Sequence, residues 1–485
     1  MQARRGKAAG HRTTPLKAKT MTKHSTTPLA IAVTLLCVGM AAQAQTTAAP
    51  AAASATSADT AAPVVTPSGN NSESGFMGGV FSAPGTTGGL SQLSVTPSYE
   101  LTGIGRRNDA AEAAILTVPG NGVPVRFENG VFVYLSALAG LGHNSNLTGV
   151  SSGAISSNLY SLQPDLVAEL KNRGDRYTLH YSGNYTHYFS SGDDDFKHHF
   201  LNAAGDNYFT SRSRLGWDVG YIDRTDPRGS TSVATANTPN RWTAPTARAI
   251  YTYGAKEAQG RIEVEGNYIS KKYQNNLAST AILNNDQAGV TGRFFYRVMP
   301  RTSLIFELRQ THTSYANNPG FTNNDTRGLV GVTWEATAKT SGTFKIGSAQ
   351  KKFSDSTIGK ATGVTWEGSV RWSPLTYSTF DLITNRAVSD STGSGNYLIN
   401  TGNSIAWNHQ WRSNLSSRAT LGTLKTDFSG VGRVDNTDNA GIGVFYEVGR
   451  NWRAGAEWAY TKRRSNQAAF EFNRNTTFFS LQGTL

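Results

Sequence analysis

Hydrophobic and polar residues alternate along the chain from residue 130 to residue 485. In residues 364–372, one set of alternate positions reads Val, Trp, Gly, Val, Trp, and the other reads Thr, Glu, Ser, Arg. Residues 262–268 and 452–460 show the same alternation. A period of two places successive side chains on opposite faces of a sheet. The pattern predicts an all-β structure with one apolar, aromatic-rich face and one face that carries charges of both signs.

Short turn signals recur about 40 residues apart in this region, and longer polar stretches, such as residues 191–195, lie between them. The short turns begin at Asn172, Ser211, Lys256, Met299, Ala338, Ser373, Trp411 and Gly449. Short turns that alternate with long loops are typical of outer-membrane barrels, which have periplasmic turns and extracellular loops. Eight short turns join sixteen strands, and the first and last strands bring the count to eighteen.

The predicted fold is therefore an all-β transmembrane antiparallel β-barrel of about 18 strands, with 16 strands as the alternative. The 356 residues from 130 to 485 give about 20 residues for each strand and its share of loop. This length leaves room for the roughly 9–11 residues that a tilted membrane strand needs. Phe479, Leu481, Gly483 and Leu485 occupy alternate positions, as expected for a final barrel strand.

The N-terminal segment has the features of a secretory signal peptide. Residues 1–23 contain seven Lys or Arg and no acidic residue, and an apolar run from Leu29 leads to Ala42-Gln43-Ala44. This arrangement predicts residues 1–44 as a signal peptide, with Met21 as an alternative start. Residues 45–129 are rich in Ala, Thr, Pro and Gly and are expected to form a disordered periplasmic lead-in or a plug. Residues 130–485 are then the barrel, located in the outer membrane of a Gram-negative bacterium.

Charge and cysteine content remove several classes of function. The chain has 46 Lys and Arg against 33 Asp and Glu, but seven of the basic residues lie in the predicted signal peptide. The remaining excess therefore gives no indication of a nucleic-acid partner. The single cysteine, Cys37, also lies in this segment, so the mature chain is expected to hold no disulfide and no cysteine-based zinc site. We expect no cofactor and no metal.

The polar positions of the alternation define a predicted lumen. The residues expected to line it are Glu263, Glu265, Arg293, Arg297, Glu307, Arg309, Glu367, Arg371, Arg453 and Glu457. The alternative is that these charges pair across strands and only support the wall. Aromatic residues at the apolar positions, such as Trp372 and Trp452, are expected to form girdles at the membrane surfaces rather than to stack on sugars.

Four histidines raise the question of a metal site. His180, His187, His198 and His199 lie close in sequence to the acidic residues 193–195. A polar loop with flanking histidines is favoured over a metal site. No Ser-His spacing indicates a hydrolase, so the protein is not expected to be an enzyme.

The start of the predicted barrel, residues 127–146, resembles the first strand of the β-barrel porins found in exopolysaccharide and capsule operons. That strand runs into a Gly-aromatic-x-x-Asn turn, and here Gly142 and Asn146 occupy the two ends of the motif, with His143 at the aromatic position. The segments that follow, up to about residue 230, are also similar. The resemblance implies export of a secreted polysaccharide across the outer membrane. The implied partners are outer-membrane lipid, the assembly machinery for outer-membrane barrels, the polysaccharide, and periplasmic or inner-membrane export proteins.

Two other functions stay open from the sequence. One is a general diffusion porin for small solutes, and the other is an adhesin or structural barrel. A general porin usually folds a long constriction loop into its channel, and no loop here clearly exceeds about twenty residues. This comparison favours the polysaccharide conduit.

Overall fold

The computed structural model describes residues 124–484, apart from residues 128, 173, 227, 229–236, 256, 338 and 392–394. The predicted signal peptide at residues 1–44 and the expected lead-in up to residue 123 lie outside the described residues. Among those described, no helix combines the length and the hydropathy that a membrane-crossing helix requires.

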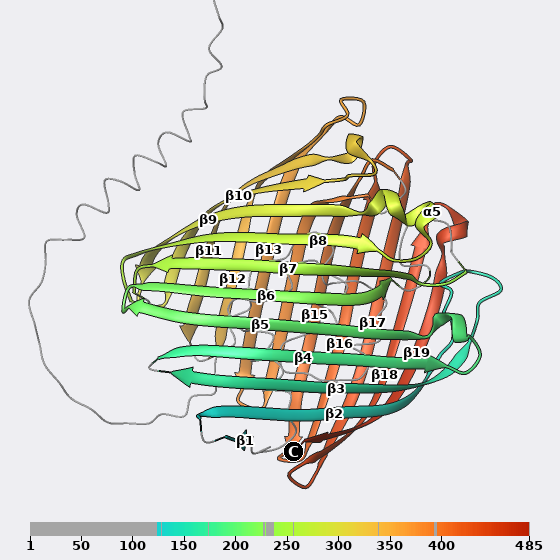
Figure 1. Ribbon diagram of the computed structural model, residues 1–485, viewed down its shortest axis with the longest axis horizontal. Helices are drawn as coiled ribbons and strands as arrows, with labels where there is room; N and C mark the ends of the chain where they lie inside the picture. The colour runs from blue at the N-terminus through green and yellow to red at the C-terminus, as the bar shows by residue number, and fades with distance from the viewer. Residues whose placement is uncertain are drawn as a thin grey trace, which may run out of the picture. The chain divides into compact units, whose positions relative to one another are not determined.

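The described chain forms one antiparallel sheet in which each strand pairs with the next, and the last strand pairs with β2 (Figure 1). The strands are β1 (Val125–Arg126), β2 (Val131–Asn144), β3 (Ser157–Asn172), β4 (Asp175–Tyr188), β5 (Phe196–Thr210), β6 (Ser213–Asp226), β7 (Asn240–Tyr253), β8 (Gly260–Tyr273), β9 (Asn285–Met299), β10 (Thr302–Ser314), β11 (Asn323–Thr337), β12 (Thr340–Phe353), β13 (Lys360–Leu375), β14 (Ser378–Asp390), β15 (Tyr397–Arg412), β16 (Leu415–Phe428), β17 (Arg433–Val448), β18 (Trp452–Ser465) and β19 (Phe472–Thr484). Strands β2 to β19 close into a barrel of eighteen strands, which confirms the predicted fold and strand number. The short strand β1 pairs with β2.

The eight predicted turns lie together at one end of the barrel, called here the turn end; seven of them have two or three residues and the β7–β8 turn has six. The connections at the other end, called the loop end, have four to thirteen residues. One predicted turn is misplaced. The turn expected to begin at Ser373 lies at residues 376–377, because β13 continues to Leu375. The β13–β14 register shifts between Trp372 and Leu375, and this irregularity accommodates Pro374, which has no N–H to donate to a regular ladder.

The two faces of the barrel wall have opposite chemistry. On β10, Phe306 and Leu308 are 47% and 60% exposed, whereas Glu307 between them is 4% exposed. The same alternation leaves Val330, Leu421 and many other large apolar side chains exposed on the outer face. A continuous exposed apolar band of this kind is expected where lipid, not water, is the surrounding medium. The polar parity therefore faces inward and the apolar parity faces the membrane.

Aromatic side chains gather on the outer face near the turn end. Trp372 on β13 stacks on Phe380 of β14, with ring centroids 5.2 Å apart, and Phe380 stacks on Trp407 of β15 at 6.3 Å. Trp411 and Trp452 are exposed at the same end. Amphipathic rings are favoured at the lipid–water interface, so this position agrees with the girdle expected from the sequence.

The seam between β19 and β2 is formed by an aromatic ring packed over two glycines. Phe478 on β19 is completely buried and faces Gly140 and Gly142 on β2. A Cβ atom at Gly140 would lie 2.3 Å from the Phe478 ring and 2.7 Å from the backbone oxygen of Phe479. The glycines therefore give the ring its space at the position where the barrel closes.

Substitution of Gly140 by Val is expected to weaken barrel closure. The added side chain must displace both Phe478 and backbone, and overpacking of this kind costs about 1–3 kcal/mol. The measurement is the free energy of unfolding in urea for the barrel refolded in lipid vesicles. Gly363→Val is the matched control, because a Cβ at this strand glycine meets no atom within 4 Å. Equal unfolding curves for the two variants would show that the seam tolerates the side chain.

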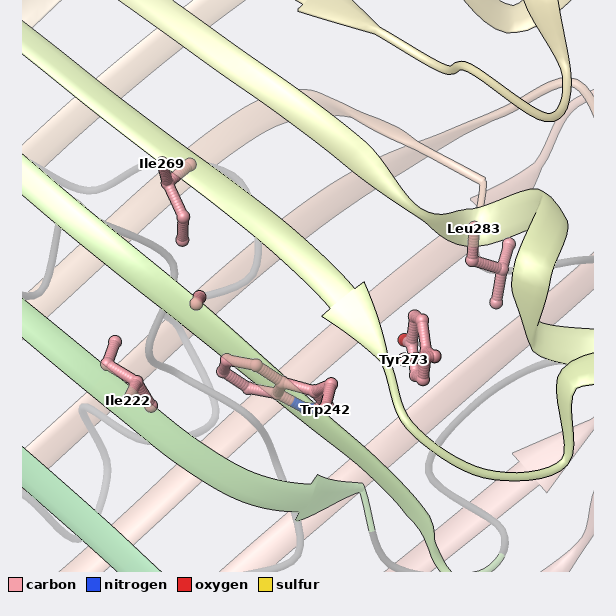
Figure 2. Close-up of a cluster of buried hydrophobic side chains, with 6 residues drawn as sticks. Ile222, Trp242, Ile269, Tyr273 and Leu283 are labelled. Carbon is pink, nitrogen blue, oxygen red and sulfur yellow. The ribbon is translucent and has the colours of Figure 1, made fainter.

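Apolar side chains also line the inner wall at the loop end of β6 to β8, as Figure 2 shows. Ile222, Trp242, Ile269 and Tyr273 come from these strands, and Leu283 comes from the 3-10 helix η3 (Ala281–Leu283) in the connection between β8 and β9. A second cluster joins Leu147, from the β2–β3 connection, to inward side chains of the barrel wall. Two connections therefore fold against the inner wall instead of extending away from it.

Candidate functional site

The inner wall has its densest charge around Glu307, in the middle of β10. The Glu307 carboxylate accepts hydrogen bonds from Arg293 Nε on β9 at 2.9 Å and from Lys345 Nζ on β12 at 3.0 Å. It also accepts one from Arg309 Nη2, two residues along the same strand, at 2.5 Å. One carboxylate thus joins three cations from three strands.

The ion pairs continue in both directions around the wall. Towards β13, Arg309 Nη1 and Lys345 Nζ lie 3.0 and 2.7 Å from the Glu367 carboxylate. Towards β7, Arg293 Nη1 lies 2.8 Å from Glu265, whose other oxygen accepts a hydrogen bond from Arg248 Nε at 2.8 Å. We call the connected set the ion-pair lattice: Arg248, Arg261, Glu263, Glu265, Arg293, Glu307, Arg309, Lys345 and Glu367. Its five cations face four carboxylates, and a fifth carboxylate, Asp218 on β6, interacts electrostatically with Arg248.

Several of these pairs join strands that are not neighbours. Lys345 on β12 reaches Glu307 on β10 across the intervening strand β11, where Gly331 lies opposite Lys345. A Cβ atom at Gly331 would lie 2.8 Å from Lys345 Cγ and 2.2 Å from the backbone oxygen of Phe344. Because Gly331 has no side chain, Lys345 can extend along the concave inner face to Glu307. The lattice therefore depends on a glycine at this position.

A smaller balanced cluster lies on the same wall towards the loop end. Arg327 Nε and Nη2 donate to the two carboxylate oxygens of Asp325 at 3.0 and 2.9 Å. Lys351 Nζ lies 2.7 Å from Asp390 and 3.8 Å from Asp325. Asp390 also accepts a hydrogen bond from the Tyr315 hydroxyl at 3.0 Å. The wall from β7 to β14 therefore carries a high density of charge with its signs compensated locally.

The ten residues predicted to line the lumen all have the inward parity, and the structure brings six of them into the lattice. The other four lie elsewhere on the inner wall. Arg371 pairs with Asp381 at 2.6 Å, and Arg297 and Arg453 pair with Glu257 and Glu447 at 2.9 and 3.4 Å. Glu457 interacts electrostatically with Arg418 and Arg453. These contacts are ion pairs of the wall, and a role in lining a solute pathway stays a prediction.

Sequence reasoning missed three members of the lattice, Arg248, Arg261 and Lys345. Lys345 lies in a clear alternation between the apolar residues Phe344 and Ile346, so the signal that selected the other residues was available for it. Arg248 has Ala on both sides, and Ile250 shares its inward parity, so the alternation on β7 is weaker. Counting every charged residue on the inward parity would have found all three.

The four histidines do not converge. His180 and His198 have inward parity and contact Asp165 and Thr225, at 3.0 and 2.8 Å. His187 and His199 have outward parity, and they contact Asp195 at 2.6 Å and Tyr181 at 3.0 Å. Within the described part of the chain, no group of three or more His, Cys, Asp or Glu side chains is arranged to hold a metal ion.

The fold and the charged inner wall agree with the comparison against protein families. A family model described as "Putative beta-barrel porin 2" matches residues 125–484, which is the whole closed barrel together with β1. The chain belongs to this family. It is an outer-membrane, porin-like β-barrel, and the family and its fold are in general non-enzymatic. The resemblance expected from residues 127–230 is thus confirmed for the family, while the link to polysaccharide operons stays a prediction.

Solved structures similar to this porin are outer-membrane proteins of low sequence identity. Pseudomonas aeruginosa OccK2 (OpdF) is 12% identical, with 74% of this chain and 99% of that chain covered and a TM-score of 0.44. The copper transporter OprC is 12% identical over 75% and 81% of the two chains, with a TM-score of 0.43. A structure described as a bacterial polysaccharide outer membrane secretin is 10% identical over 72% and 98%, with a TM-score of 0.33. No curated protein sequence matches the chain.

Proposed function

We propose that this outer-membrane barrel is a conduit through which an exopolysaccharide leaves the cell. The observation that carries the proposal is the ion-pair lattice, in which five cations and four carboxylates on β7 to β13 pair with one another, beside Asp218 of β6, which interacts with Arg248. The wall is strongly polar, yet it presents no large field of one sign over these strands.

A wall of this kind suits a long hydrated solute. A sugar chain exchanges hydrogen bonds with many polar groups as it moves, and conduction requires each contact to be weak enough to release. Charges that already hold one another in ion pairs keep the lumen wet without trapping the chain. Residues such as Glu307 and Arg309 are therefore proposed to maintain the pathway and not to bind the solute directly.

The second candidate function is a diffusion porin for small solutes. The strand bounds limit the longest connection to residues 227–239, between β6 and β7. This is short for a loop that must cross a channel of eighteen strands, so the lengths of the connections favour the export conduit. The partners that we expect for this function are periplasmic and inner-membrane polysaccharide-export proteins below the turn end.

Deletion of the gene is expected to abolish secreted polysaccharide and to leave growth on small sugars and amino acids unchanged. The physical reason is that a polymer needs a dedicated passage through the outer membrane, whereas small solutes have other porins. The measurements are the mass of extracellular polysaccharide and the growth rate on limiting small solutes, with a complemented strain as control. Normal polysaccharide together with slower growth would favour the diffusion porin. Loss of adhesion alone would favour the adhesin.

A further inference from the structure

The outer face of the barrel differs in charge between its two ends. In the last four residues of each described strand at the loop end, the outward positions carry eight cations: Lys197, Arg241, Lys272, Lys352, Lys360, Lys425, Lys462 and Arg464. The corresponding outward positions at the turn end carry no Lys or Arg in the described strands, and one carboxylate, Asp175. We call the eight cations the basic rim.

Half of the basic rim is neutralised by the protein itself. The outward positions near the loop end also carry four carboxylates: Asp223, Asp286, Asp427 and, slightly deeper on β17, Asp438. These form ion pairs with four members of the rim: Arg241, Lys272, Lys425 and Arg464. The other four members form no ion pair with any residue that the structure describes: Lys197, Lys352, Lys360 and Lys462. The rim therefore keeps a net positive charge on the outer face.

Two of these lysines are direct neighbours across strands. Lys352, the second-last residue of β12, lies opposite Lys360, the first residue of β13, and both side chains are exposed. On the other side of Lys352, the opposite residue on β11 is the uncharged Asn324. Like charges directly opposite one another destabilise a sheet. The pair therefore costs stability unless an anion from outside the chain lies between the two ammonium groups.

The acidic residues near the two lysines already have other partners. Asp355, in the connection between β12 and β13, accepts hydrogen bonds from the backbone N–H and the hydroxyl of Thr357, at 2.8 and 2.7 Å. Asp325 and Asp390 have inward parity and pair with Lys351 on the opposite face of the wall. The anion that the lysine pair needs is therefore expected to come from the surroundings of the barrel.

The height of the lysine pair on the wall matches that of a lipid headgroup. Lys352 lies six residues along β12 from Ile346, which pairs with Val330 at the centre of β11. Six residues of a strand tilted by about 40° rise about 15 Å along the barrel axis. The apolar band of an outer-membrane barrel is about 25 Å tall, so the two ammonium groups lie just beyond its edge. An anion at this level belongs to a lipid of the surrounding leaflet.

We propose that the basic rim binds phosphate groups of a phosphorylated glycolipid in the outer leaflet, with Lys352 and Lys360 binding one phosphate between them. The loop end faces this leaflet, because barrels of this class have periplasmic turns and extracellular loops. An ammonium group binds phosphate as a point charge through three N–H donors, so two lysines match a dianionic phosphate in charge. The proposal concerns the outer face and is independent of what the barrel conducts.

Native mass spectrometry of the full-length mature chain, refolded in detergent, tests the proposal by counting bound lipids. The probes are lipid A with two phosphates, lipid A with both phosphates removed, and inorganic phosphate. Bisphosphorylated lipid A is expected to bind at least tenfold more tightly than the phosphate-free form. Lys352→Gln combined with Lys360→Gln is expected to weaken the tightest binding step about tenfold, because each basic residue near an anionic lipid surface strengthens binding. Lys352→Arg combined with Lys360→Arg keeps both charges and is expected to bind like the wild type.

Arg301→Gln combined with Arg450→Gln is the matched control. Both arginines are exposed, and they lie in the β9–β10 and β17–β18 turns at the opposite end of the barrel. This variant loses the same two charges without changing the basic rim, so its binding of bisphosphorylated lipid A is expected to match the wild type. Heat-modifiable mobility on gels verifies that all variants are folded.

Each alternative result overturns the proposal in a defined way. Equal binding of phosphate-free lipid A would show that the acyl chains determine binding, and equal weakening by the two Gln variants would show an effect of net charge without a site. Inorganic phosphate that binds as tightly as lipid A, and with the same sensitivity to loss of the lysines, would make the pair a site for the free ion. If loss of the lysines changed the oligomeric state and left lipid binding unchanged, this face would be a contact between copies of the chain.

Discussion

Substitution of Glu307 by Gln is expected to destabilise the barrel by about 3–5 kcal/mol, the usual cost of removing one partner from a buried ion pair. Glu307 contacts three cations, Arg293, Arg309 and Lys345. The amide keeps the shape of the side chain but removes its charge, so the lattice loses one of its four carboxylates while all five cations stay. The measurement is the free energy of unfolding in urea for the barrel refolded in lipid vesicles.

Glu257→Gln is the control for the Glu307 variant. Glu257 pairs with Arg297 at 2.9 Å, but its side chain is 82% exposed in the turn between β7 and β8. Exposed ion pairs contribute at most about 1 kcal/mol, so this variant is expected to unfold close to the wild type. A wild-type unfolding curve for Glu307→Gln would mean that the lattice is solvated and does not support the wall.

A double variant separates the loss of charge balance from the loss of hydrogen bonds. In Glu307→Gln combined with Lys345→Met, one carboxylate and one cation are removed together, so the net charge of the lattice returns to that of the wild type. We expect the double variant to recover part of the stability lost by the single variant, because neighbouring sites in one network are not additive. If the double variant lost more unfolding free energy than the two single variants together, the loss would instead come from packing around Lys345.

The alternation of residues was sufficient to predict the architecture of the barrel. Each membrane strand faces lipid on one side and a polar interior on the other, so its hydrophobic and polar residues must alternate. The alternation in residues 364–372 therefore gives the outward and inward faces of β13. Strand number followed from the short turns, because a turn of two or three residues admits little besides an antiparallel hairpin. Pro374 shows the limit of this reasoning, since a turn-favouring residue is accommodated inside β13 by a register shift.

The contacts of the inner wall could not be predicted in the same way. Arg309 and Glu367 are 58 residues apart and lie on β10 and β13, with two strands between them. Their contact depends on the curvature of the wall, and the neighbouring contact between Lys345 and Glu307 depends on the space that Gly331 leaves; neither feature is visible in local periodicity. The sequence predicted which side chains face inward, and the three-dimensional closure decides which of them meet.

The contact between Arg474 and the β2–β3 connection shows a second limit. Arg474 is not among the residues predicted to line the lumen, because the alternation in its strand, Phe472–Thr484, indicates mainly the outward apolar positions. Its Nε donates to the backbone oxygen of Asn146, which is 328 residues away in the chain. The available signal was indirect, since the motif ending at Asn146 had been identified by resemblance and its structural consequence had not.

Substitution of Val330 by Arg is expected to cost about 2–4 kcal/mol of barrel stability, as a cation on the lipid face does near the middle of the membrane. Val330 lies at the centre of β11, is 53% exposed, and pairs with Phe306 and Ile346 on the two neighbouring strands. Because Val330 is central, the charged end of an arginine at this position lies about half a strand length from either membrane surface. Loss of assembled, heat-modifiable barrel in outer-membrane fractions measures the effect in cells, and unfolding in urea measures it in vesicles.

The matched substitution on the inner face is Ser404→Arg, at the centre of β15. Ser404 has inward parity and pairs with Ile383 on β14 and with Gly422, which has no side chain, on β16. Because the inner face is polar, this arginine is expected to leave assembly unchanged. Equal losses for the two variants would mean that the faces are not divided between lipid and lumen as the parity requires. If Val330→Arg assembled normally and Ser404→Arg did not, the assignment of the two faces to lipid and lumen would be reversed.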